Sequence, residues 1–217
     1  MKDERTQHTI HRLEAFSDVV IGFCLAQLGL SLVLPKSESD LTSVWISATF
    51  FVSAFLFIAV LWWLHHRTFS AFFVLNVPMV VINFAMLCGL VLTLYFLDSI
   101  VRVAGLGQNP AIFFSLFVLS FALVYALAGA MLLTGLFLRR TELPTSEIRW
   151  AIGQLTSIAS SILFGIGAAA YVALRSHSAQ IGYAVIAAAI ALAVLRRIAV
   201  RRWLDRRLPE AQKPLPD

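Results

Sequence analysis

The sequence predicts an all-α integral membrane protein with six transmembrane helices in each subunit. Hydrophobic residues make up 59% of the 217-residue chain and charged residues only 13%, and the mean hydropathy is +0.84. Soluble domains are about half apolar and about a quarter charged, so a water-facing fold could not bury this much apolar surface. The chain also contains apolar runs of about 20 residues, which is the length that crosses the hydrocarbon core of a bilayer.

The six apolar runs have boundaries that are soft by several residues. The first follows a charged stretch, but no small-residue cleavage site precedes Pro35, so we expect this span to be retained and not removed as a signal peptide. We expect one transmembrane domain, residues 12–203, between a cytoplasmic segment, 1–11, and a basic cytoplasmic tail, 204–217. The spans lie at residues 16–34, 44–64, 72–97, 111–138, 150–174 and 179–200.

The charges predict the orientation. Six spans place both termini on the same side of the membrane. All of the 17 Lys and Arg residues lie on that side except Lys36, Arg102 and Arg175. Because loops rich in Lys and Arg stay in the cytoplasm, we expect a protein of the cell membrane with both termini cytoplasmic. This placement accounts for the pI near 9.7 through topology and contact with anionic lipids, so we expect no nucleic-acid partner.

No motif indicates catalysis, a cofactor or a bound metal. Cys24 and Cys88 stand alone in separate apolar runs and are read as small core residues. His65 and His66 are adjacent, so they point to different helix faces, and a metal site there lacks a third ligand. The chain has no GxSxG, HExxH or glycine-rich phosphate loop, and we expect no enzyme activity. A potassium-filter loop and an arginine-rich voltage-sensor helix are also missing.

Asp18 is the one acidic residue inside a predicted span and away from its edges. A carboxylate at that depth is costly unless it is paired or hydrated, so it is a candidate functional residue. The orientation places His65, His66 and Arg67 at the same depth as Arg12 and Asp18. Two interpretations remain open: a polar lock between the first two helices, with a guanidinium or imidazolium as partner of Asp18, or a station for protons or ions.

The first span has two distinct faces at 100° per residue. One is a stripe of small residues that allows close helix packing: Gly22, Ala26 and Gly29. The other is bulkier and contains Phe16, Phe23, Gln27, Leu30 and Leu34. If several copies of this helix met around an axis, the bulky stripe would narrow a pore to a hydrophobic constriction, which can gate by dewetting. Such a stripe is also compatible with ordinary helix packing.

Two short motifs carry a family resemblance. Arg12 is followed after three residues by Phe-Ser-Asp at the start of the first span, and "LHHRTF" closes the second. The combination resembles the unconventional potassium channels of the transmembrane protein 175 family. The resemblance implies a homotetramer of single six-span units with a pore lined by the first helix and no filter loop. It also implies a helix-holding role near the cytoplasmic end for Arg12, Phe16, Ser17 and Asp18, with His65, His66 and Arg67 as partners.

The pore positions follow the family pattern less closely. Family members usually carry a branched aliphatic residue, a threonine and a leucine at five, eight and twelve residues after the Asp; here these positions hold Phe23, Ala26 and Leu30. An alanine ring offers no hydroxyl oxygen to a cation, although the neighbouring Gln27 carries an amide. We therefore expect a potassium-permeable channel, with two alternatives: a poorly selective cation or proton leak of the same fold, and a non-conducting membrane scaffold.

Overall fold

The computed structural model describes residues 2–30, 41–106, 108–174, 198–199 and 202–203. The predicted sixth span, 179–200, lies almost entirely outside the described residues, as do the tail, 204–217, and Leu34. Within the described part of the chain the protein is all-helical. Its five helices are α1 (Lys2–Leu30), α2 (Leu41–Phe72), α3 (Val77–Gly105), α4 (Ala111–Arg139) and α5 (Thr145–Leu174).

Most of the helices continue beyond the predicted spans, but α3 begins later than predicted. α1 includes the charged segment before its apolar run and begins at Lys2. α3 begins at Val77 instead of the predicted residue 72, because the chain turns at residues 74–76 and the Oδ1 of Asn76 accepts a hydrogen bond from the backbone N–H of Met79 at 2.9 Å. An asparagine in this position supplies an acceptor for an N–H that has no partner within the helix.

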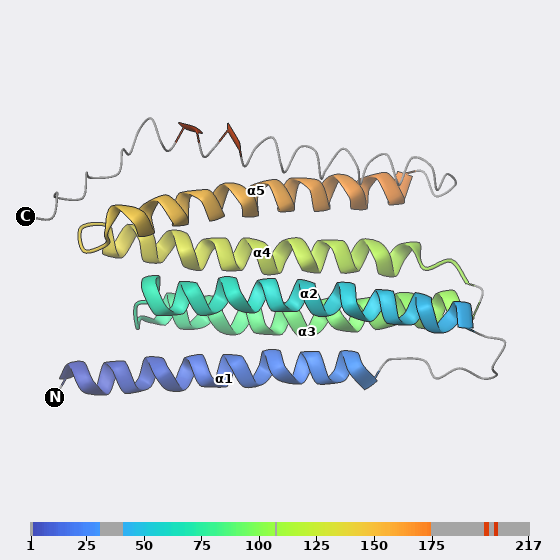
Figure 1. The fold of residues 1–217 in the computed structure, drawn as a ribbon, viewed down its shortest axis with the longest axis horizontal. Helices are drawn as coiled ribbons and strands as arrows, with labels where there is room; N and C mark the ends of the chain where they lie inside the picture. The colour runs from blue at the N-terminus through green and yellow to red at the C-terminus, as the bar shows by residue number, and fades with distance from the viewer. Residues whose placement is uncertain (1, 31–40, 107, 175–197, 200–201, 204–217) are drawn as a thin grey trace, which may run out of the picture.

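The helices run alternately up and down (Figure 1). α1 packs against α2 and α3, and α4 packs against α2, α3 and α5, whereas the backbones of α2 and α3 stay apart along most of their length. The α2–α3 and α4–α5 connections and the N-terminus of α1 lie at one end of the bundle, which we call the basic end because it carries Arg12, Arg67 and Arg139.

Four stretches of the described residues are long and apolar enough to cross a membrane: Glu4–Leu30, Val77–Ile100, Ala111–Arg139 and Thr145–Gly167. The 32-residue α2 lies alongside them and is itself mostly apolar. The protein is therefore an integral membrane protein built of α-helices.

Small residues on α3 and α4 allow the helices around α4 to approach one another closely. A Cβ added to Gly89 of α3 would lie 3.0 Å from Val124, and one added to Gly129 would lie 3.0 Å from Ile158 of α5. The closest approach is at Gly135, where an added Cβ would overlap the carbonyl oxygen of Phe72 at the end of α2. Tight packing of small residues is the usual way that helices associate inside a membrane, and it makes α4 the centre of the subunit.

Candidate functional site

A chain of buried hydrogen bonds joins α1, α2 and α3 near the basic end. Ser17, His65 and Asn83 are all 0% exposed. The Oγ of Ser17 donates to the carbonyl of Leu13 at 2.9 Å, and the Nδ2 of Asn83 donates to that same Oγ at 3.1 Å. The Nε2 of His65 lies 2.8 Å from the Oδ1 of Asn83.

The direction of these hydrogen bonds assigns the histidine tautomer. The one proton of the Ser17 hydroxyl goes to Leu13, so this oxygen accepts from the amide of Asn83. The amide oxygen of Asn83 is then an acceptor, and the Nε2 of His65 must carry the hydrogen. His65 is thus held as a donor between helices whose backbones do not meet, and Asn83 is the residue that connects them.

Asp18 has a different partner from the expected guanidinium or imidazolium. Its Oδ1 accepts a hydrogen bond from the indole Nε1 of Trp62 at 2.8 Å. Arg12 is six residues away and therefore about 120° around the helix from Asp18, while His65 is occupied by Asn83. The Trp62 ring also stacks on the ring of His66, with the centroids 5.5 Å apart and the planes at 13°.

The two remaining basic residues of "LHHR" pair with carboxylates that are not among the predicted site residues. The Nδ1 of His66 lies 2.9 Å from Glu14 of α1. Arg67 points to the other side of α2, where its Nη2 lies 2.8 Å from Glu147 of α5 and its guanidinium lies 5.0 Å from the ring centroid of Trp150. His66 thus joins α2 to α1, and Arg67 joins α2 to α5.

The residues predicted as one polar network therefore belong to separate contacts. Ser17 and His65 share the Asn83 network, and Asp18 pairs with Trp62. His66 contacts Glu14, and Arg67 forms an ion pair with Glu147. Phe16 packs edge-on against Phe84 of α3, with the ring centroids 5.7 Å apart. Arg12 is exposed, and no carboxylate of the described residues pairs with it.

Sequence reasoning missed Asn83, Trp62, Glu14 and Glu147. For Asn83 the signal was available, because an amide inside an apolar span needs a buried partner. Trp62 lies near the end of the second predicted span, and its indole N–H is a donor that suits a carboxylate. Glu14 and Glu147 lie outside the predicted apolar spans, where charged residues are common and do not indicate a buried partner.

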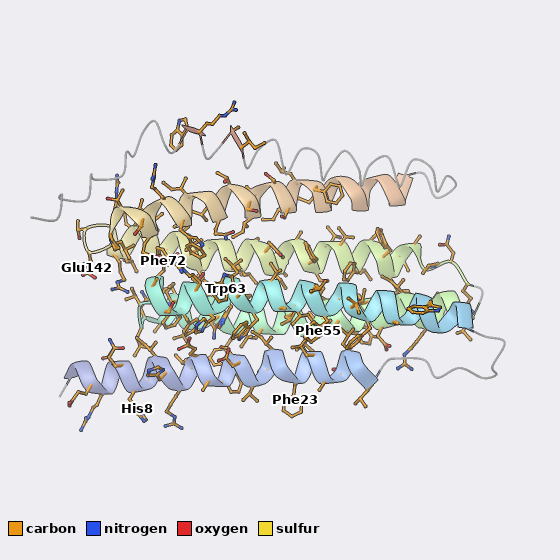
Figure 2. All side chains as sticks on the ribbon, in the orientation of Figure 1. His8, Phe23, Phe55, Trp63, Phe72 and Glu142 are labelled. Carbon is orange, nitrogen blue, oxygen red and sulfur yellow. The ribbon has the colours of Figure 1, made fainter. Side chains whose placement is uncertain are left out.

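The bulky stripe of α1 points away from the subunit. Phe23 is 73% exposed and Leu30 is 88% exposed, and Ala26 and Gln27 between them are exposed as well. Figure 2 shows the Phe23 ring on the side of α1 opposite the other helices. The opposite face of α1 is buried in the subunit core through Ile21, Cys24 and Leu28.

Within the residues that the structure describes, no group of three or more His, Cys, Asp or Glu could hold a metal ion. Cys24 and Cys88 are free thiols, Cys24 buried and Cys88 exposed. The polar residues of the basic end are paired with one another in geometries that hold helices together. The outer edge of α1 is one of several surfaces of the described helices that present large apolar side chains to the surroundings of the subunit.

Comparison with known proteins finds one matching family model and a similar solved structure. Residues 12–93, which include most of α1, all of α2 and the first half of α3, match the sequence model of the family described as endosomal/lysosomal potassium channel TMEM175. Among solved structures, the chain is similar to a variant of the potassium channel MtTMEM175, crystallised in complex with a nanobody–MBP fusion protein. The TM-score is 0.62 and the sequence identity 17%, over 90% of this chain and 94% of that chain. No curated protein matches the sequence.

Proposed function

Because the chain belongs to the TMEM175 family, we propose that it is a potassium channel that conducts passively through a central pore lined by α1. The observation that carries the proposal is the outward-facing edge of α1, where Phe23 and Leu30 are the most exposed large hydrophobic side chains of the helix. We propose a homotetramer in the cell membrane, in which four copies of this edge surround the axis and the basic end faces the cytoplasm.

Gln27 favours the axis over lipid as the environment of this edge. It is exposed on the subunit surface between Phe23 and Leu30, within the apolar stretch of α1. A side-chain amide that faces hydrocarbon has no hydrogen-bond partners, whereas one that lines a hydrated pore is solvated. An edge that carries an amide between two bulky apolar residues therefore suits a narrow, partly hydrated pathway.

In this arrangement Phe23 and Leu30 form two hydrophobic constrictions, and Ala26 and Gln27 face the ions between them. Leu34, which we also assign to the pore, lies outside the described residues. A hydrophobic constriction stops conduction by excluding water, so side-chain or helix movement must widen it before ions pass. No other protein partner and no cofactor are required, and the function is transport and not catalysis.

A second candidate function is a poorly selective cation or proton leak of the same fold. Ala26 favours it, because a ring of alanines has no oxygen with which to replace the hydration shell of a cation. Reversal potentials measured under gradients of potassium, sodium and protons distinguish the two functions. A potassium channel reverses near the potassium equilibrium potential, and a leak does not.

Potassium flux from liposomes reconstituted with confirmed tetramers tests the proposed function directly. We expect flux above that of empty liposomes, and we expect the Phe23→Ala variant to conduct more than the wild type, because it widens the constriction. Leu163→Ala is a matched control, since Leu163 is exposed on α5. Helix α5 lies on the opposite side of the bundle from α1 (Figure 1). Absence of flux from tetramers leaves a non-conducting scaffold and refutes the channel, whereas an unchanged or lower current in Phe23→Ala refutes only the assignment of the constriction.

A further inference from the structure

α1 continues well beyond the part of the subunit that supports it. Its last packed side chains toward the N-terminus are Ile10 and Leu13, which contact the apolar cluster of Phe69 and Phe73 at the basic end. Nearly all the described side chains before Ile10 are exposed. Figure 1 shows this first part of α1 projecting past the ends of α2 and α3. The helix therefore carries its outer face into the water beyond the bundle.

The projecting segment and the proposed pore edge share one helix face. Arg5 and Arg12 are seven residues apart, and Arg12 and Phe23 are eleven apart; at 100° per residue each of these pairs differs by only about 20°. Arg5 and Arg12 are both exposed. Figure 2 places His8 and Phe23 on the same side of α1, away from the other helices. We call this face, which contains Arg5, His8, Arg12, Phe23 and Leu30, the outer stripe.

The two arginines of the outer stripe keep their charge uncompensated within the described part of the chain. Other arginines of the subunit pair with a carboxylate, as Arg67, Arg102 and Arg139 do. No such pair involves Arg5 or Arg12. The carboxylates nearest to Arg12 along α1, Glu14 and Asp18, are turned to the other side of the helix, where Glu14 meets His66 and Asp18 meets Trp62.

We propose that Arg12, assisted by Arg5, sets the conductance of the channel from its cytoplasmic side by forming rings of positive charge around the pore mouth. The inference rests on the proposed function, in which the outer stripe of each subunit faces the tetramer axis. Four copies of Arg12 then lie just outside the apolar part of the pore. Their potential repels potassium and lowers its local concentration before it reaches Phe23.

Arg12 contributes more than Arg5 because it is closer to the constriction along the helix, by the length of two turns. The effect must depend on salt, because charges in water are screened over about 30 Å at 0.01 M but only about 3 Å at 1 M ionic strength.

Single-channel recording in planar bilayers tests the proposal. We compare the wild type with Arg12→Gln in symmetric KCl at low and high concentration, and measure the unitary current carried by potassium that flows from the cytoplasmic side. At about 10 mM salt we expect Arg12→Gln to raise this current about three-fold, and at about 1 M we expect the two currents to converge because the ring is screened. Arg5→Gln should give a smaller increase in the same direction.

Two controls separate charge from structure. Arg140→Gln removes an exposed arginine at the same end of the bundle, on the α4–α5 connection and off the outer stripe, so it should leave the current unchanged. Arg12→Lys keeps the charge and should behave as the wild type. The proposal is overturned by a current that is unchanged in Arg12→Gln at low salt, by an equal increase at high salt, or by an equal increase in Arg140→Gln. Absence of any potassium current in the wild type refutes the proposed function instead.

A second variant covers the case in which Arg12→Gln does not assemble. Arg12→Cys is made together with Cys88→Ser, because Cys88 is an exposed thiol and Cys24 is buried. The assembled channel is then treated from the cytoplasmic side with a positive or a negative methanethiosulfonate reagent. At low salt the positive reagent should lower the outward current and the negative reagent should raise it. The same change with both reagents would indicate steric block and refute an electrostatic role for this position.

Discussion

Replacing Asn83 by leucine should destabilise the subunit through a single unsatisfied donor. The Nε2–H of His65 loses its acceptor, while the hydroxyl of Ser17 keeps its bond to Leu13. Hydrogen bonds between membrane helices contribute about 0.6 kcal/mol on average and up to about 1.7 kcal/mol. Two of them are removed, so we expect a loss of about 1–3 kcal/mol, with most of it arising at His65.

Thermal unfolding of the purified protein, followed by intrinsic tryptophan fluorescence, measures this loss. One kcal/mol shifts the midpoint by about 2–4 °C in chains of this length, so Asn83→Leu should lower Tm by about 2–12 °C. Ser99→Ala is the control, because its hydroxyl bonds only to the backbone of the same helix at Tyr95, and its Tm should stay within about 1 °C of the wild type.

A double-mutant cycle then tests the cause. His65→Phe removes the stranded donor and preserves a ring against Phe69, whose centroid lies 4.6 Å from that of His65. Replacing both partners of a hydrogen bond by apolar groups costs far less than replacing one, so His65→Phe with Asn83→Leu should recover part of the lost Tm. If the double variant loses the sum of the two single effects, or if Asn83→Leu melts as the wild type does, the reasoning fails.

Two further changes have definite expected outcomes. Gly135→Ala should lower Tm strongly, by an amount equivalent to about 1–3 kcal/mol, because the added methyl group overlaps the carbonyl oxygen of Phe72; Gly153→Ala meets nothing within 4 Å and should be neutral or slightly stabilising. Equal Tm values for the two variants would contradict the packing of α2 on α4. Trp62→Phe removes the N–H that bonds Asp18 and should destabilise the subunit. Asp18→Asn, which keeps an acceptor oxygen, should be milder in the same melting assay.

The fold class followed from composition and span length, and the structure confirms it for the helices it describes. The apolar pattern could not predict that α1 continues to Lys2, because the residues before the span carry no periodic apolar signal over most of their length. It also placed the start of α3 too early, since "FFVLN" is as apolar as the helix that follows. The start of α3 is set by the capping residue Asn76 and by Pro78 in the first turn. A hydropathy average detects neither of these signals.

The candidate site was predicted in part. Position along the helix was enough to bring Ser17, Asp18, His65 and His66 to one end of the bundle, because antiparallel spans have matching depth. The partners were not predictable in this way. Which of Arg12, Trp62 or His66 meets Asp18 depends on the rotation of α1 and α2 about their own axes, and a hydropathy profile contains no information on that rotation. The outward direction of Phe23 and Leu30 agrees with the predicted stripe, and their place at an axis stays a prediction.

The helices of the subunit are held together in two different ways. α3, α4 and α5 are held together by close backbone packing around glycines, whereas α1 is fastened to its neighbours near the basic end by a few discrete polar links: Asn83 to Ser17, Trp62 to Asp18 and His66 to Glu14. Between these links and Leu30, α1 is held by apolar side chains in the subunit core, among them Ile21, Cys24 and Leu28. A tilt of α1 about the polar links would therefore have to slide this apolar face over its neighbours, and the displacement would be largest at Leu30.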